Sequence, residues 1–411
     1  MKKLLGVLLA IAMSWPASAT VLKNVEVVGE IQTIASDVRT NNTAVTLPRT
    51  YNTGTSARVL AGLSADLVED VTANLLFQYA NEWGQDSAAG KDVNTYWGDI
   101  RLVNANVVLH NLFCAFDVTV GRQFYGDEDS AIIYFGPNHY NAEFNGYTRS
   151  LDAAKITYAD DVKSLTLIGG RVNQSAQFSG VIPAPAAAAS FDIYGADFKL
   201  HMGDNLTAQV YGYDVRDEWG DNDAGIYGAK VGMNVEAVRA AVEYARNFGG
   251  DRLIKEHNKA DGGKGHMLKV DVAADIEAVT ARGAFVYANE NFQALGNYTP
   301  GLLVGHDLGG NFYDYSNGEG VALFNLGFDV KPFEKWTFSL DGYTFQDHRM
   351  DHSATLEADL TAKYDHNEYV QLFAGVGYAK YTATDAYANV YNKAVLGSDN
   401  VKGQLGMLIK F

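Results

Sequence analysis

The chain has 411 residues with a formal net charge of -17, and it is rich in residues typical of two-faced strands, with 41 Gly, 24 Tyr and 20 Phe. The acidic balance argues against nucleic acid or anionic lipid as the main partner. The only cysteine, Cys114, excludes an intramolecular disulfide, so the stability of the fold must come from hydrogen-bonded strands.

The N-terminus predicts a secretory signal peptide. It combines a basic pair, Lys2 and Lys3, an apolar run at residues 4–13, and small residues up to Ala19. A membrane anchor would need about twenty apolar residues, which is twice the length of this run. We therefore expect cleavage between Ala19 and Thr20, and the loss of the two lysines changes the net charge from -17 to -19.

With residues 1–19 as the signal peptide, residues 20–411 form one domain in which apolar and polar residues alternate in short segments. Such alternation predicts strands with one apolar and one polar face. In chain order we predict strands at residues 22–36, 55–68, 71–83, 96–109, 113–124, 147–159, 163–175, 190–202, 206–219, 224–235, 238–248, 266–276, 279–291, 320–331, 335–349, 352–364, 369–382 and 401–411. The predicted fold is therefore all-β, a transmembrane antiparallel β-barrel of about 18 strands.

The predicted connections alternate in length. Short polar turns, such as residues 69–70, 203–205 and 365–368, alternate with connections that are mostly long. Short periplasmic turns and long external loops are typical of barrels of the bacterial outer membrane. The prolines after residue 19 all fall in predicted connections: Pro48, Pro137, Pro183, Pro185, Pro300 and Pro332. The tryptophans after residue 19 fall at strand ends, where an aromatic girdle would meet lipid head groups: Trp83, Trp97, Trp219 and Trp336.

The last predicted strand carries a candidate assembly signal. Its residues alternate up to the C-terminal Phe411, and Gln404, Gly406, Ile409 and Phe411 resemble the C-terminal recognition signal of bacterial outer-membrane barrels. We therefore expect two partners, the barrel assembly machinery and outer-membrane lipid.

The polar strand faces predict a water-filled lumen, because a barrel of this size is too wide for side chains to fill. A lipid-facing Arg or Lys near the midplane costs about 2 to 4 kcal/mol, which favours inward positions for charged residues. Strand parity predicts these pore-lining residues: Arg58, Asp66, Lys155, Asp197, Lys199, Lys230, Arg239, Glu243, Lys269, Asp271, Arg282, Asp341, Glu357, Asp359 and Lys363. Arg101, Arg122 and Arg246 share the apolar phase of their strands, so each must lie near an interface or follow a bulge.

One motif resembles a known family. Gly121, Arg122 and Gln123, followed by Gly126 and Asp127, are similar to the Gly-Arg-Gln signature, trailed by Gly-Asp, of alginate-export-type outer-membrane barrels. The resemblance implies an eighteen-stranded channel in the outer membrane for anionic uronate polymers.

These patterns predict a non-enzymatic, porin-like channel of the bacterial outer membrane for passive diffusion of small polar or carbohydrate solutes, including oligosaccharides. The predicted lumen charges nearly balance and the acidic excess falls in the connections, which favours a weak cation preference at low salt. The alternative is a structural or adhesive barrel whose loops bind a partner, with a connection such as 125–146 or 292–319 closing the lumen.

The sequence disfavours a catalytic site and a calcium site. His352 and Ser353 are the nearest pair for catalysis, but neighbouring strand residues point to opposite faces. Acidic clusters at residues 127–129 and 217–223 match no defined calcium-loop spacing. We therefore predict neither a metal nor a cofactor.

Overall fold

The structure is a computed structural model of the chain. It describes residues 23–41, 50–83, 100–140, 148–173, 190–217, 223–249, 265–289, 292, 294–296, 298–303, 320–346, 349–350, 355–380 and 399–411. The predicted signal peptide and its cleavage site between Ala19 and Thr20 lie outside the described residues.

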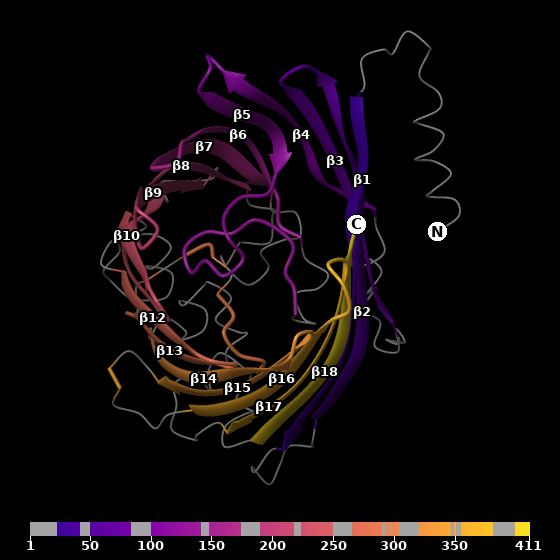
Figure 1. Cartoon of the computed structure of the whole chain (residues 1–411), viewed down its shortest axis with the longest axis vertical. Helices are drawn as coiled ribbons and strands as arrows, with labels where there is room; N and C mark the ends of the chain where they lie inside the picture. The colour runs from indigo at the N-terminus through magenta and orange to yellow at the C-terminus, as the bar shows by residue number, and fades with distance from the viewer. Residues whose placement is uncertain are drawn as a thin grey trace.

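Eighteen antiparallel strands form one closed barrel (Figure 1), which confirms the predicted all-β fold. In chain order the strands are β1 (Lys23–Asn41), β2 (Thr50–Val68), β3 (Val71–Trp83), β4 (Arg101–Leu112), β5 (Phe116–Gln123), β6 (Leu151–Ala159), β7 (Lys163–Asn173), β8 (Ser190–Met202), β9 (Leu206–Asp217), β10 (Asp223–Val235), β11 (Val238–Gly249), β12 (His266–Ile276), β13 (Val279–Ala288), β14 (Val321–Phe333), β15 (Trp336–Gln346), β16 (Thr355–Asp365), β17 (Val370–Lys380) and β18 (Asp399–Lys410). Each strand pairs with its neighbours in sequence, and β18 pairs with β1. Among the described residues, no helix is long and apolar enough to cross a membrane.

The seam between β1 and β18 closes the barrel. The two strands pair from Asn41 and Asp399 to Glu30 and Lys410. Beyond this point the N–H of Gly29 donates to the carbonyl oxygen of Phe411 at 2.8 Å, and the N–H of Phe411 donates back at 3.0 Å. Closure supplies the backbone partners that strands need in lipid. The residues of the candidate assembly signal lie at this seam: Gln404, Gly406, Ile409 and Phe411.

The outer face of the wall is apolar. Leu326, Leu340, Leu360, Val376 and Leu405 come from five successive strands, and each is more than half exposed. A continuous apolar surface of this kind marks contact with lipid. Together with the closed barrel, it places the protein in the bacterial outer membrane, as predicted.

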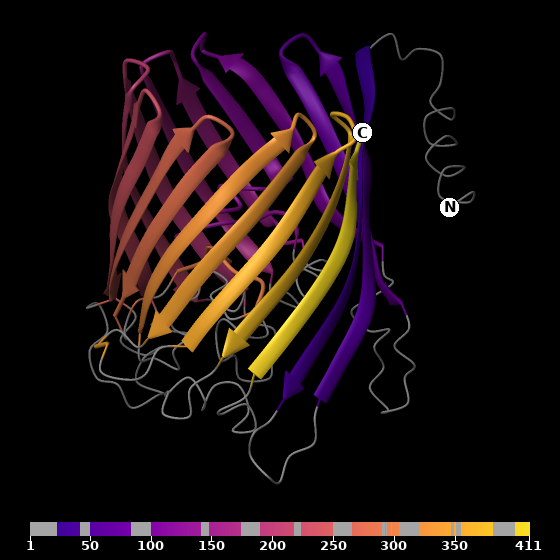
Figure 2. The same cartoon turned by 60° about the horizontal axis from the view of Figure 1, so that its bottom comes forward.

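One end of the barrel carries short turns, and Figure 2 shows them with the end of β18 on the same side. Near this end Trp336 stacks on Phe338, with ring centroids 5.6 Å apart, and contacts Tyr364 at 4.8 Å. Trp83 ends β3 at the opposite end of the barrel. The other two predicted girdle residues, Trp97 and Trp219, lie outside the described residues.

The prediction for Pro332 was wrong. Pro332 lies within β14 and not in a connection. It is tolerated there because the register between β14 and β15 shifts between Val330 and Phe333, and such an irregularity takes a residue out of the hydrogen-bonded ladder.

The arginines in the apolar phase lie near the strand ends that lead to the long connections. Arg101 begins β4, and Arg246 lies near the end of β11. Arg122 belongs to a row of residues of alternating charge that runs across the strands from β5 to β9. Each residue in the row is the register partner of the next: Arg122, Asp152, Arg171, Asp192 and Arg216. Arg122 binds Asp152 at 2.7 Å and Arg171 binds Asp192 at 2.6 Å. Ion pairs at this level fit the lipid head-group zone.

Candidate functional site

The motif that ends β5 turns the chain into the barrel. Gly121 has a φ of 123° and Gly126 a φ of 85°. A side chain is strained at either position, and a Cβ added at Gly121 would also meet the carbonyl oxygen of Ala105. Gln123 faces inward, and its side-chain Nε2 donates to the carbonyl oxygen of Ala153 at 2.9 Å. These residues shape the start of a segment, residues 124–140, that we call the first inward loop.

The first inward loop crosses the lumen (Figure 1). Tyr125 and Phe135 exchange backbone hydrogen bonds of 2.8 and 2.7 Å, which fold the loop into a hairpin-like turn. The hydroxyl of Tyr125 lies 3.0 Å from that of Tyr213 on β9, and burial raises the pKa of Tyr125 to about 12. The contact between Tyr125 and Tyr213 therefore anchors the first inward loop to the wall.

A second inward loop, formed by the described residues between 292 and 303, meets the first inside the barrel. The N–H of Leu295 donates to the carbonyl oxygen of Ile132 at 2.8 Å, and the N–H of Tyr134 donates to Leu295 at 3.0 Å. The two loops thus share a short piece of backbone pairing, with a parallel bridge between Ile133 and Leu295.

Carboxylates of β16 hold the second inward loop against the wall. The N–H of Leu303 donates to Glu357 at 2.7 Å, and the N–H of Leu302 donates to Asp359 at 2.9 Å. Both carboxylates are almost fully buried. Glu357 and Asp359, both predicted to line the pore, therefore anchor the second inward loop.

Apolar side chains on the inner wall pack against the two loops. Phe135 and Phe292 of the loops are fully buried, in one cluster with residues of the surrounding strands that include Val172, Ile193, Met267, Leu323 and Phe345. On several strands the inward residues therefore change from apolar near the long connections to charged farther along. On β8, for example, Phe191 and Ile193 precede Asp197 and Lys199 in the same phase.

Residues of the first inward loop help to line each of two charged cavities in the described part of the lumen. The larger, of about 690 Å³, carries four lysines on its lining, Lys155, Lys199, Lys230 and Lys269. Three of them belong to one lateral row across β8 to β12: Lys199, Gln209, Lys230, Glu243 and Lys269. The acidic side chains of the same lining are Asp127, Asp129, Asp197 and Glu243.

Contacts with neighbouring residues restrict the movement of the Lys269 and Glu243 side chains. The Lys269 ammonium binds Asp271 at 2.8 Å and lies 4.6 Å from the ring centre of Tyr298 in the second inward loop. Glu243 accepts a 2.8 Å hydrogen bond from Tyr211. Within the part of the chain that the structure describes, none of Lys155, Lys199 and Lys230 forms an ion pair, and all three line the larger cavity.

The smaller cavity, of about 500 Å³, has an acidic balance. Its acidic lining residues are Glu128, Asp129, Asp329, Asp341 and Asp359, and its basic ones are Arg282, Lys363 and His139. Arg282 binds Asp329 at 2.8 Å and Asp341 at 3.0 Å, while Lys363 lies 4.2 Å from the ring centre of Tyr140. Because Asp129 lines both cavities, the first inward loop forms part of the partition between them.

Solved outer-membrane porins share this barrel fold. The structure is similar to the crystal structure of Pseudomonas aeruginosa OpdQ, with a TM-score of 0.62 and 10% identity over 95% of this chain and 98% of that one. Acinetobacter baumannii OccAB1 matches with a TM-score of 0.62 and 14% identity over 97% and 100% of the two chains. Pseudomonas aeruginosa OccD3 (OpdP) matches with a TM-score of 0.58 and 11% identity over 98% of each chain.

No family model matches the sequence, and no curated protein matches it. None of these three structures is of the alginate-export type, so they support a porin-type barrel fold and leave the alginate-export resemblance without support. The contacts in this chain give its motif a structural role, because Gly121 and Gln123 shape the backbone and Arg122 binds Asp152 on the outer face.

The remaining predicted pore-lining residues lie on the inner face outside both cavities. Arg58 is fully buried and donates to Glu30 and Gln32, each at 2.7 Å. Near the short turns, Asp66 accepts a 2.6 Å hydrogen bond from Asn24, and Arg239 binds Asp275 at 3.0 Å. In the described part of the chain, no group of three or more His, Cys, Asp or Glu side chains could hold a metal ion.

The predicted pore-lining set lacks several residues that the structure places inside the barrel, among them Glu30, His139, Asp329 and Lys402. Glu30 and Lys402 share the inward phase of their strands, so the period-two pattern contained that signal. The position of His139 depends on the path of the first inward loop, which has no period.

Proposed function

We propose that the protein is an outer-membrane channel for passive diffusion of small hydrophilic solutes, and that it favours solutes carrying both a positive and a negative charge. The observation that carries this proposal is the division of the lumen into two cavities with different charge balance. The larger cavity has four lysines against four carboxylates, whereas the smaller has five carboxylates against Arg282, Lys363 and His139.

A dipolar solute gains from this arrangement because each end finds charges of opposite sign. Its carboxylate can approach Lys155 or Lys230, while its cationic group lies near the acidic residues around Asp129. Low-dielectric walls strengthen such interactions relative to bulk water. A uronate polymer carries only negative charge, so it would meet repulsion at the acidic lining of the smaller cavity.

Planar bilayers and proteoliposomes test this proposal. We expect discrete single-channel conductance steps with the purified protein. In a liposome swelling assay, a zwitterionic amino acid should enter faster than an uncharged solute of the same size. Equal rates for the two solutes would contradict the proposed preference, and the double variant Lys155→Gln, Lys230→Gln should remove it.

The alternative, a structural barrel with a closed lumen, has an observation in its favour as well. The two inward loops bind each other and bury apolar side chains across part of the lumen. The absence of conductance at every salt concentration, in a preparation that migrates as folded barrel, would favour this alternative.

A further inference from the structure

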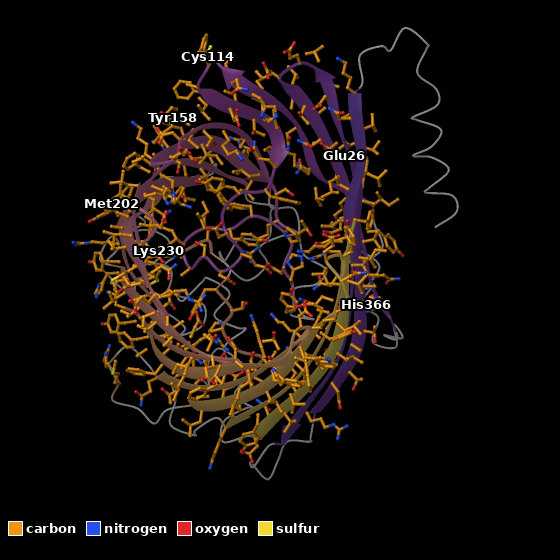
Figure 3. All side chains as sticks on the ribbon, viewed as in Figure 1. Glu26, Cys114, Tyr158, Met202, Lys230 and His366 are labelled. Atoms are coloured by element: carbon orange, nitrogen blue, oxygen red, sulfur yellow. The ribbon has the colours of Figure 1, made fainter. Side chains whose placement is uncertain are left out.

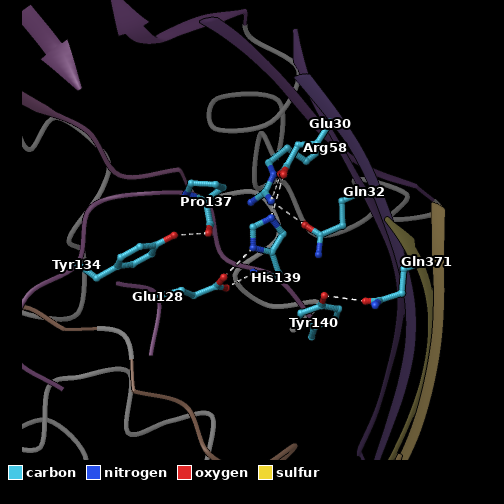
Figure 4. A network of polar contacts seen from close by, with 9 residues as sticks. All are labelled: Glu30, Gln32, Arg58, Glu128, Tyr134, Pro137, His139, Tyr140 and Gln371. Carbon is cyan, nitrogen blue, oxygen red and sulfur yellow. Dashed lines mark hydrogen bonds and ion pairs between the residues drawn. The ribbon is translucent and has the colours of Figure 1, made fainter. Parts of the chain in front are cut away.

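His139 of the first inward loop lies between a carboxylate of the same loop and a carboxylate of the barrel wall (Figure 4). Its Nδ1 lies 2.7 Å from Glu128 of the same loop, and its Nε2 lies 2.9 Å from Glu30 on β1. The histidine side chain is only 12% exposed and that of Glu30 only 11%. This bridge is a side-chain contact between loop and wall, and its strength depends on the charge of the imidazole.

Charged groups from several elements surround the imidazole. Arg58 on β2 donates to the other oxygen of Glu30, and Asp129 and Glu128 belong to the loop itself. Lys363 of β16, which also lines the smaller cavity, lies over the ring of Tyr140. Burial raises the pKa of Tyr140 to about 12, so this phenol stays neutral around neutral pH.

The bridge requires both ring nitrogens of His139 to donate, because a carboxylate oxygen faces each of them. An imidazolium has two N–H donors, whereas a neutral imidazole has one donor and one lone pair. When His139 loses its proton, a lone pair therefore faces one carboxylate and that contact is lost.

The contact to Glu30 is the weaker of the two once the ring is neutral. Glu128 also accepts a 2.6 Å hydrogen bond from the backbone N–H of His139, so it stays with the loop. Glu30 keeps Arg58 as a partner. Loss of the proton therefore breaks the contact between His139 and β1 and leaves each carboxylate with a remaining hydrogen-bond donor, while Tyr140 keeps its hydrogen bonds to Gln371 and Gln404.

We propose that His139 is a protonation-dependent latch that holds the first inward loop against β1 and β2 and so sets the width of the lumen. The inference rests on the proposed channel function and adds its regulation. When the latch is released, the loop residues Glu128 and Asp129 move relative to β1, and both line the smaller cavity.

The direction of the pH response follows from the surroundings. Burial by itself lowers the pKa of His139, but the hydrogen bonds that its ring donates to Glu128 and Glu30 outweigh this effect, so this pKa lies above the ordinary value. The latch is closed below that pKa and is released as the pH rises through it, above about 6.5. Alkaline conditions should therefore widen the channel.

Single-channel recording between pH 6 and pH 9 tests the latch. We expect the wild-type conductance to rise with pH in one titration. The variant His139→Gln should lose that titration, and Glu30→Gln should shift its midpoint to lower pH because one carboxylate no longer favours the imidazolium. His366→Gln, in an exposed turn between β16 and β17, is the control and should behave as wild type. A titration unchanged in His139→Gln would overturn the proposal.

A second measurement separates the latch from the channel function. Hydrogen exchange of residues 124–140, followed by mass spectrometry, compares wild type with His139→Gln at one pH at a time, so the intrinsic exchange rate cancels. We expect slower exchange in wild type at pH 6 and equal rates at pH 9. Equal rates at both pH values would refute the latch even in a conducting channel, whereas absent conductance with the expected exchange would refute only the channel function. Heat-modifiable migration verifies that each variant is folded.

Discussion

The backbone N–H of Leu295 donates to the carbonyl oxygen of Ile132 at 2.8 Å, so two connections from distant parts of the sequence meet inside the barrel. Neither loop could bury its backbone and apolar side chains alone in a water-filled lumen. Together with the inner wall they form an apolar cluster on one side and leave charged cavities elsewhere. Figure 3 shows that the strands of the wall carry side chains on both faces, toward the lumen and away from it.

The anchor of the second inward loop on β16 should be sensitive to a single substitution. Glu357→Ala removes the acceptor of the buried Leu303 N–H, which costs about 1 to 3 kcal/mol. The loop should loosen, and limited proteolysis of the folded barrel should cut it faster than in wild type. Leu356→Ala, on the outer face of the same strand, should leave the cleavage rate of this loop unchanged. Equal cleavage rates for Glu357→Ala and wild type would show that the carboxylate is not the anchor.

Strand register predicts which side chains a water-soluble thiol reagent can reach. In a Cys114→Ala background, cysteines at Arg239 and Lys269 should react from the lumen. Cysteines at Ala240 and Val270 lie one residue farther along β11 and β12, face lipid, and should stay protected. Mass spectrometry of the labelled protein gives the reacted fraction. The opposite pattern would mean that the register is shifted by one residue.

The sequence was sufficient to predict the strands of the wall and the faces of their residues, but not the contacts of the two inward loops. Period two follows from the pleat of a strand, so the inward phase of Lys199 or Asp341 can be derived from neighbouring residues alone. The first inward loop has no period, and contacts such as His139 with Glu30 join residues far apart in sequence. The fully apolar inner positions of β8, Phe191 and Ile193, could have indicated that something packs inside the barrel.

Ion selectivity should reflect the acidic balance of the smaller cavity. We expect a weak cation preference at low salt that fades as salt rises, because the Debye length is about 10 Å at 0.1 M. Lys230→Gln should strengthen this preference and Asp329→Asn should weaken it, since each changes one charge of the cavity lining. Reversal potentials across a potassium chloride gradient measure both shifts.

The matched control for selectivity is Glu277→Gln, in the turn between β12 and β13 and outside both cavities. It should shift the reversal potential less than either lumen variant. A strong anion preference that persists at high salt would contradict the charge balance of the cavities and restore a polyuronate as the solute.

The C-terminal residue should matter both for recognition and for closure of the barrel. Deleting Phe411 removes the last position of the candidate assembly signal and both backbone hydrogen bonds with Gly29, which extend the seam between β1 and β18. We expect a secreted chain that inserts poorly and is degraded before it reaches the membrane, measured as loss of the heat-modifiable form from outer-membrane fractions. Phe411→Tyr keeps the backbone pair and the aromatic ring, so it should insert normally, whereas Phe411→Ala keeps only the backbone pair. If Phe411→Ala inserts like wild type while the deletion fails, the seam hydrogen bonds carry the effect. Full insertion of the deletion itself would reject both roles for this residue.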